Sequence, residues 1–393
     1  MDRSTGNKAA SSVVQPWFVV AALVVGGAYA IGTTDPPPAM QAKLQPPTGG
    51  IGGTMKTLDE IEPRTPISDR FLDTQAGATF VIDQPGSYYL PGDLFVGTNQ
   101  IGVKVMAAPV TIDLMGHTID GMNLSNDLIH VDPLADRVVI KNGTLRRSGE
   151  RGIDSYADTV HIEMVEVVET RRSGISLDTG RAATLRDVTV ADTGTASGAD
   201  RDGIRLVGPG AVRARDIDVT GAGGNGIATG SGTVLTLVDA FVADTGISGV
   251  SAGDKAIVRS VRVENSNSHG IVTGADATVE DCHVDAPRGN GIQAGSRSRV
   301  EKNRVYVHEA SAAPLGAGVM LIGDDAIVCH NVTNGGGSAF FGIRLNGSRN
   351  LLSCNRNYAN AGFSLSSGNM VGNILTSVAS YNSNQDPDAN FDL

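Results

Sequence analysis

Short apolar runs alternate with glycine and polar residues along most of this chain. From residue 152 onward, a glycine followed by a branched or large apolar residue recurs ten times, at separations of 20 to 29 residues. The pairs are Gly152-Ile153, Gly174-Ile175, Gly203-Ile204, Gly226-Ile227, Gly249-Val250, Gly270-Ile271, Gly291-Ile292, Gly318-Val319, Gly342-Ile343 and Gly362-Phe363. A sustained period of this length predicts a repeat architecture.

Within each unit a second apolar alternation follows the first, as in DVTV at 187–190 and SVRV at 260–263. Alternation with a period of two predicts strands, and the spacing between them leaves no room for crossover helices. The units are too rich in glycine and β-branched residues for helical repeats and too short for propeller blades. The remaining architecture is all-β, a coil of short strands stacked in parallel on the next coil.

The pattern also divides the chain into segments. Looser strand-like runs precede the regular units, so we expect the stacked coils to cover residues 78–380. Apolar residues at helical spacing within 55–67 predict a short helix, part of an N-terminal cap over 55–77 that covers the open strand edges. Residues 381–393 form a polar C-terminal tail.

The N-terminal residues predict that the folded part of the protein lies outside the cytoplasm. Residues 13–32 carry no charge, follow Arg3 and Lys8, and contain a small-x-small site at 28–30. This pattern predicts a signal peptide over 1–32, with an uncleaved N-terminal membrane anchor as the alternative. The Pro- and Gly-rich segment 33–54 is a linker. The folded part is therefore expected to be extracytoplasmic: secreted, periplasmic or anchored at the cell surface.

Composition narrows the classes of protein. The 393 residues include 50 glycines, are 40% hydrophobic and only 4% aromatic, which excludes a disordered chain and an ordinary mixed enzyme. A net charge of −11 argues against a nucleic-acid partner. Three cysteines are too few for disulfides to be the main source of stability. Cys329 and Cys354 fall on adjacent coils, where either a disulfide or a pair of buried thiols fits.

A family resemblance follows from these units. The NGI and HGI segments at 225–227, 269–271 and 290–292, with VTIDLMGHTIDG at 110–121, resemble the repeats of the pectate-lyase-like superfamily, especially exported bacterial β-helix proteins. The resemblance implies a single-stranded right-handed parallel β-helix of about 12 coils, each of about 20–24 residues. Its members range from lyases, glycosidases and epimerases to tailspikes and adhesins, so it implies a polysaccharide partner but no single activity.

Charged residues gather around the first strand of three adjacent coils. They are Arg151 and Asp154, then Arg171, Arg172 and Asp178, then Arg201, Asp202 and Arg205. By resemblance to the superfamily's lyases, Arg172 and Arg205 are candidate catalytic residues for β-elimination on an acidic polysaccharide. Asp178 and Asp202 are candidate calcium ligands. Arg151, Asp154, Arg171, Arg201 and His269 are candidate substrate contacts. The alternative is a solvated ladder of ion pairs.

Other chemistry is less well supported. The superfamily's polygalacturonase-type hydrolases carry an NTD segment that is missing here, and the pair Asp324-Asp325 follows His269 instead of preceding it. His269 directly precedes a unit-opening glycine, a position typical of turn residues that bond to the backbone. The sequence thus predicts a protein that binds extracellular carbohydrate or acts as a rigid surface element, with a uronate lyase as the alternative.

Overall fold

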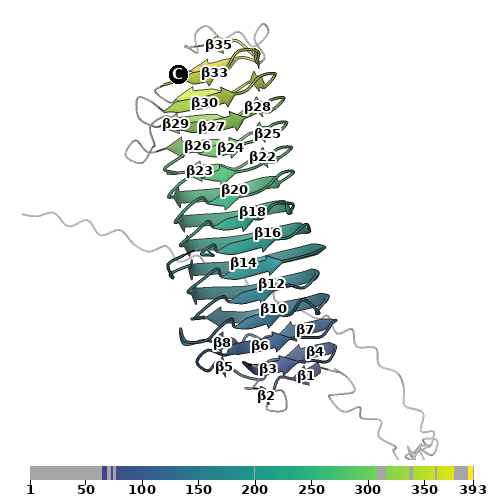
Figure 1. Ribbon diagram of the computed structural model, residues 1–393. Coiled ribbons are helices and arrows are strands. Elements are labelled where there is room, and N and C mark those ends of the chain that lie inside the picture. Colours follow the sequence, from purple (N-terminus) through teal and green to yellow (C-terminus); the bar gives the residue numbers. More distant parts are fainter. Residues whose placement is uncertain are drawn as a thin grey trace, which may run out of the picture. The chain divides into compact units, whose positions relative to one another are not determined.

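The fold is a stack of short parallel strands wound along one axis (Figure 1). A computed structural model describes residues 64–68, 72–73, 77–198, 200–307, 316–335, 340–358, 361–375 and 388–392. These residues belong to one compact unit, Thr57–Leu393, whereas the unit Met1–Lys56 lies outside the described residues. The predicted signal peptide or membrane anchor and the linker that follows it therefore lie outside the described residues. Within it, no helix is long and apolar enough to cross a membrane.

The strands form two sheets. The first has 22 strands: β1 (Arg64–Pro66), β4 (Gly86–Tyr89), β5 (Leu94–Phe95), β7 (Val110–Asp113), β8 (Thr118–Asp120), β10 (Arg137–Arg146), β12 (Thr159–Thr170), β14 (Ala182–Thr193), β16 (Ala211–Ala222), β18 (Val234–Thr245), β20 (Ile257–Ser266), β22 (Thr278–Glu280), β23 (His283–Asp285), β25 (Arg299–Glu301), β26 (Arg304–Val307), β28 (Ile327–Cys329), β29 (Val332–Gly335), β31 (Leu351–Ser353), β32 (Arg356–Tyr358), β34 (Met370–Val371), β35 (Ile374–Leu375) and β36 (Asn390–Asp392).

The second sheet has 14 strands: β2 (Leu72–Asp73), β3 (Ala78–Ile82), β6 (Ile101–Val105), β9 (Ile129–Val131), β11 (Ile153–Ser155), β13 (Ile175–Asp178), β15 (Ile204–Val207), β17 (Ile227–Thr229), β19 (Val250–Ser251), β21 (Ile271–Val272), β24 (Ile292–Ala294), β27 (Ala317–Ile322), β30 (Phe341–Asn346) and β33 (Phe363–Leu365). The described strands pair in parallel except for β2 with β3. The predicted all-β parallel solenoid of about 12 coils is confirmed.

The apolar residues of the glycine units form one buried ladder. Ile153 pairs with Ile175, which pairs with Ile204, and the register continues from coil to coil as far as Phe363. The preceding glycines are required by close packing. At Gly226 an added Cβ would lie 2.3 Å from Val242 Cγ1 and 2.7 Å from the Gly249 carbonyl oxygen. The spacing of the glycine units therefore predicted the register of the 14-stranded sheet.

The long strands of the other sheet bend at a stacked position near their middle. In β12 the buried residues are 160 and 162 before the bend and 165 and 167 after it, so one extra residue interrupts the alternation. That residue, Met164, has a φ of 53°, and Asp187, Asp216 and Asp239 occupy the same position in the next coils with φ of 51–54°. Aspartate tolerates left-handed backbone because its short side chain can bond locally. The column of bends turns each long strand around a corner of the coil.

Two segments near the ends differ from the sequence predictions. The helix predicted over 55–67 reaches into described residues only at its end, where Arg64–Pro66 is strand β1 and pairs with β4. Its earlier part lies outside the description. From the polar C-terminal segment, β36 adds a strand beside β32 and β35. The stack of strands thus runs from β1 to β36, beyond the expected limits of 78 and 380.

The three cysteines are free thiols. Cys329 and Cys354 do lie on adjacent coils, but Cys329 pairs in register with Ser353, so the two cysteines are offset by one residue. Burial raises the pKa of Cys282 to about 12 and that of Cys329 to about 11. Of the two possibilities left open for Cys329 and Cys354, the structure contains thiols and no disulfide.

Candidate functional site

A row of polar side chains runs across neighbouring strands of the 14-stranded sheet. Its members are Lys104, His130, Asp154, Ser176 and Arg205, which stack in register on β6, β9, β11, β13 and β15. Because side chains alternate between the faces of a strand, these residues point away from the core ladder. The next four positions of the row are the uncharged Ala228, Ser251, Val272 and Gln293. Charge is thus concentrated in the N-terminal coils.

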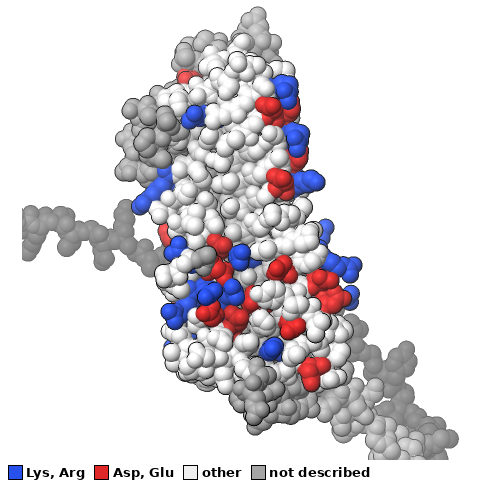
Figure 2. Space-filling view, viewed as in Figure 1, with Lys and Arg blue, Asp and Glu red and all other residues white. Residues whose placement is uncertain are grey.

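The same concentration is visible on the molecular surface. Figure 2 shows one face on which basic and acidic side chains gather over the N-terminal coils, whereas the middle of the face toward the C-terminal coils is mostly uncharged. Both signs of charge are intermixed in this patch. A mixed patch of this kind can offer both hydrogen-bond donors and acceptors to a polar ligand.

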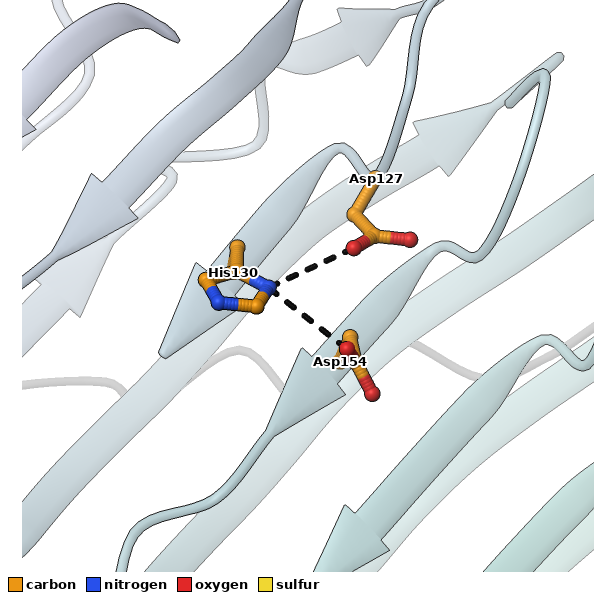
Figure 3. A group of neighbouring side chains, drawn as sticks. All are labelled: Asp127, His130 and Asp154. Carbon is orange, nitrogen blue, oxygen red and sulfur yellow. Dashed lines mark hydrogen bonds and ion pairs between the residues drawn. The ribbon is translucent and has the colours of Figure 1, made fainter. Parts of the chain in front are cut away.

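His130 lies between two carboxylates (Figure 3). Its Nδ1 is 3.3 Å from Asp127 Oδ2 and 3.5 Å from Asp154 Oδ2. Asp127 lies two residues before β9. Its Oδ1 accepts a hydrogen bond of 3.1 Å from the Arg151 backbone N–H. The hydrogen bonds to Asp127 and Asp154 raise the pKa of His130 from 6.5 to about 9. The imidazole is therefore a cation at neutral pH.

Arg151 connects this histidine to a third carboxylate. Its Nη1 is 3.3 Å from Asp154 Oδ2, and its Nε donates a 2.8 Å hydrogen bond to Asp200 Oδ2. The hydroxyl of Ser173 donates to the other oxygen of Asp200 at 2.6 Å, and Arg205 Nη1 lies 3.9 Å from that oxygen. Only 18% of the Arg151 side chain and 9% of the Asp200 side chain is exposed. Burial strengthens these interactions, because water screens them less.

Tyr156 adds an aromatic surface beside the charges. Its ring centroid is 5.8 Å from that of His130, and the residue is 40% exposed. The negative charge of Asp154 and burial both raise the pKa of the Tyr156 hydroxyl. The hydroxyl therefore keeps its proton at physiological pH, and part of the side chain is open to solvent.

A pocket of about 450 Å³ adjoins this cluster. It is lined by Gly149, Glu150, Arg171, Arg172, Ala196, Ser197 and Gly198. Arg172 forms an ion pair with Glu150. The guanidinium of Arg171 has no ion-pair partner among the described residues and is exposed. We refer to this pocket together with Asp127, His130, Arg151, Asp154, Tyr156 and Asp200 as the lateral site.

The structure brings together some of the residues predicted from sequence. Arg151 contacts both Asp154 and Asp200, Arg205 lies beside Asp200, and Arg171 and Arg172 line the adjoining pocket. Arg201 lies in the turn next to Asp200 but takes no part in the ion pairs described for this cluster. The expected gathering of these side chains on three coils is therefore largely observed.

Asp178 and Asp202, the candidate calcium ligands, are not brought together. The Asp202 backbone N–H bonds to Ser173 Oγ at 3.1 Å, which places Asp202 beside the residue five positions before Asp178. Five extended residues span about 16 Å, too far for one ion. Asp202 Oδ1 instead accepts hydrogen bonds from the backbone and side-chain nitrogens of Asn225, at 2.8 and 3.0 Å. This carboxylate stabilises a turn.

His269 also has a structural role. Its Nδ1 accepts a 2.9 Å hydrogen bond from the backbone N–H of Asn290 in the next coil, and burial lowers its pKa. It lies five coils beyond β11, about 24 Å along the stack. The interpretation of His269 as a turn residue is confirmed, and it is not part of the lateral site.

Residues 128–306 match the family model described as right handed beta helix region. The chain carries a right-handed β-helix. The predicted handedness and the resemblance to this class are confirmed. No curated protein matches the chain.

Several solved β-helix structures are similar to this right-handed β-helix. The A-module of the mannuronan C-5 epimerase AlgE4 of Azotobacter vinelandii is 16% identical, with a TM-score of 0.45 over 77% of this chain and 94% of that one. The GH136 lacto-N-biosidase of Eubacterium ramulus is 13% identical, with a TM-score of 0.44 over 74% and 63%. The catalytic unit of the GH87 α-1,3-glucanase of Streptomyces thermodiastaticus is 13% identical, with a TM-score of 0.38 over 78% and 66%.

Among the charged and aromatic residues of the lateral site, five were not predicted from sequence: Asp127, His130, Glu150, Tyr156 and Asp200. His130 does carry a signal in the sequence, because it is the polar residue within the apolar run LIHV at 128–131 of the β-helix. Asp127 precedes this run in the position where later coils have turn residues. Asp200 carries no such periodic signal, because it lies in an irregular turn before β15.

Proposed function

We propose that this right-handed β-helix binds an acidic polysaccharide outside the cytoplasm, at the lateral site. The observation that carries the proposal is the pocket in which Arg171 has no ion-pair partner among the described residues, next to a half-buried cluster of charged side chains. A guanidinium in such a pocket can pair with a substrate carboxylate through two parallel hydrogen bonds.

The rest of the site suits a sugar chain. Tyr156 offers an exposed ring face to the apolar side of a sugar, and the Asp127, Asp154 and Asp200 carboxylates can accept hydrogen bonds from hydroxyl groups. Equivalent positions on successive coils recur about every 4.8 Å, so the surface is extended in the direction of the stack. The uncharged segment 13–32 supports an extracytoplasmic location.

Uronate lyase activity is a second candidate. Elimination transfers the C5 proton to a base, forms a C4–C5 double bond and expels the C4 oxygen, which takes a proton from an acid. His130 carries a proton at neutral pH and suits the acid role, and Tyr156 lies beside it. The raised pKa of Tyr156 works against a role as base. Arg172 and Arg205, the predicted catalytic residues, lie beside Glu150 and Asp200. Binding is therefore the better supported function.

Retention on immobilised glycans tests the binding proposal. The chain should bind polyuronates more tightly than uncharged glucans, and Arg171→Glu should reduce polyuronate binding at least about tenfold by loss of a charge-assisted contact. The matched control is Arg213→Glu, a charge reversal at an exposed arginine of β16. Equal binding by Arg171→Glu and the unaltered chain, or no binding to any acidic glycan, would reject the proposal and favour a rigid surface element without a glycan site.

Lyase activity is tested separately by absorbance near 235 nm after incubation with polyuronates, with and without Ca²⁺. An unsaturated product that is lost in His130→Gln would establish the second candidate. A chain that binds polyuronate but forms no such product would reject it.

A further inference from the structure

We infer that Asp127, His130 and Asp154 form a binding site for a divalent transition-metal ion, with Zn²⁺ as the best match. One atom from each side chain contributes, and the three atoms lie within 4.8 Å of one another (Figure 3). The distances from His130 Nδ1 to the two carboxylate oxygens are 3.3 and 3.5 Å. Ligands bound tetrahedrally at about 2.0–2.1 Å from zinc are separated by about 3.3–3.4 Å.

The surrounding contacts hold the carboxylates in place. The second oxygen of Asp127 accepts a hydrogen bond from the Arg151 backbone N–H at 3.1 Å, and Arg151 Nη1 lies 3.3 Å from Asp154 Oδ2, the oxygen that also faces His130. Asp200 in turn binds the Arg151 side chain. Hydrogen-bonded ligand carboxylates are a regular feature of metal sites, because the outer contacts orient the ligands. The β9–β11 register places His130 beside Asp154 without any movement of the backbone.

The charges of the cluster also match a dication. With a neutral imidazole, the carboxylates of Asp127, Asp154 and Asp200 and the guanidinium of Arg151 sum to −2, from three negative charges and one positive charge. A divalent ion would bring this buried group to neutrality, whereas a proton on His130 supplies only one positive charge. Arg205 is more exposed and lies farther from Asp200, so it offsets less of this charge.

The ligand types distinguish the metal. One imidazole nitrogen and two carboxylate oxygens suit Zn²⁺ and its first-row neighbours, whereas Ca²⁺ takes six to eight oxygens. Three protein ligands leave a fourth position for water or a ligand oxygen. His130 is 21% exposed, so solvent reaches the site. The inference rests on this geometry and does not depend on the proposed glycan binding.

Titration calorimetry with ZnCl₂ at pH 7.5, on metal-stripped chain without a polyhistidine tag, should give one site per chain. His130→Gln should weaken the affinity at least about tenfold. The control His161→Gln removes an imidazole 3.4 Å from Glu163 and should leave the affinity unchanged.

Absence of zinc binding by the folded chain, or equal affinity in His130→Gln and the unaltered chain, would overturn the inference. If His130→Gln does not fold, NMR of the seven histidines of the unaltered chain decides the question. Zinc should shift the His130 ring resonances first, at one equivalent. A first shift at any other histidine would reject the site.

Discussion

At the scale of single residues, His130 has the clearest electrostatic signature in the lateral site. Asp127 and Asp154 raise its pKa from 6.5 to about 9. In metal-free protein, its NMR titration should therefore have a midpoint near 9, and Asp154→Asn should lower that midpoint because one of the two stabilising charges is lost. A midpoint near 6.5 in the unaltered chain would contradict the geometry of the cluster.

The same shift makes stability depend on pH. Because the folded pKa is the higher one, the stabilisation is complete below pH 6.5 and is lost as the pH rises through 9. This difference in pKa corresponds to an upper bound of about 3.4 kcal/mol, which solvent screening of the partly exposed imidazole reduces. The thermal midpoint of the unaltered chain should fall between pH 6.5 and 9.5 by more than that of His130→Gln. Parallel curves for the two proteins would show that His130 makes no such contribution.

Sequence reasoning found the arginines of the site but missed the partners that organise them. Asp200 is the reason: it contacts Arg151, which is 49 residues earlier in the chain. The separation of 29 residues between Gly174 and Gly203 is the longest in the repeat, and the extra residues include the turn that carries Asp200. Such a turn has no periodicity, so its side chains cannot be placed without coordinates.

At the scale of the elements, the unit-opening glycines control the contact between coils. Gly226→Ala would place a methyl group 2.3 Å from Val242 Cγ1 and 2.7 Å from a backbone oxygen. We expect a loss of about 2 kcal/mol in the free energy of unfolding, because the coils cannot separate locally without breaking strand pairs. Denaturant unfolding of the variant measures this loss.

The matched control is Gly253→Ala. At Gly253 the nearest atom to an added Cβ is 3.6 Å away, which is ordinary contact, so this variant should change stability by less than about 1 kcal/mol. If the two variants are equally stable, the close packing at the unit-opening position is not what requires glycine.

A ladder of buried asparagines stabilises the C-terminal coils. Asn303, Asn331, Asn355 and Asn390 stack within them, and each side-chain amide donates to the carbonyl oxygen of the next at 3.0, 3.0 and 3.1 Å. Asn331→Ala would leave the amide of Asn303 buried without this acceptor. We expect a loss of about 2 kcal/mol or more, measured by denaturant unfolding.

The control for this ladder is Asn334→Ala, a truncation of an exposed asparagine in β29, three residues after Asn331. It should change stability by less than about 0.5 kcal/mol. A loss as large as that of Asn331→Ala would show that the ladder carries no special stabilisation.

The elements were predictable to different degrees. The glycine units set the register of the inner ladder from sequence alone, because their spacing repeats. The bends at Asp187 and Asp216 were not predicted, because an aspartate within an apolar alternation also fits an outward-facing strand position. The one-residue offset between Cys329 and Cys354 was not predicted for a similar reason. The number of residues between a cysteine and its unit-opening glycine does not show how many extra residues the bends of that coil contain.

At the scale of the whole molecule, the stack of coils combines a uniform core with a charge pattern that changes along its length. The row on the 14-stranded sheet contains Lys104, His130, Asp154 and Arg205 between β6 and β15 and no charged residue over the next four strands. A purely structural rod has no need for half-buried Arg151, His130 and three carboxylates at one level of the stack. This concentration supports the binding function that we propose for the lateral site, alongside the pocket that contains Arg171.

A crystal structure of the chain with a bound uronate oligosaccharide tests that assignment most directly. We expect a sugar carboxylate beside Arg171 in the pocket lined by residues 149–150, 171–172 and 196–198, with a neighbouring sugar ring against Tyr156. An oligosaccharide bound elsewhere on the β-helix, or a lateral site that contains no ligand at a concentration that saturates binding in solution, would contradict it.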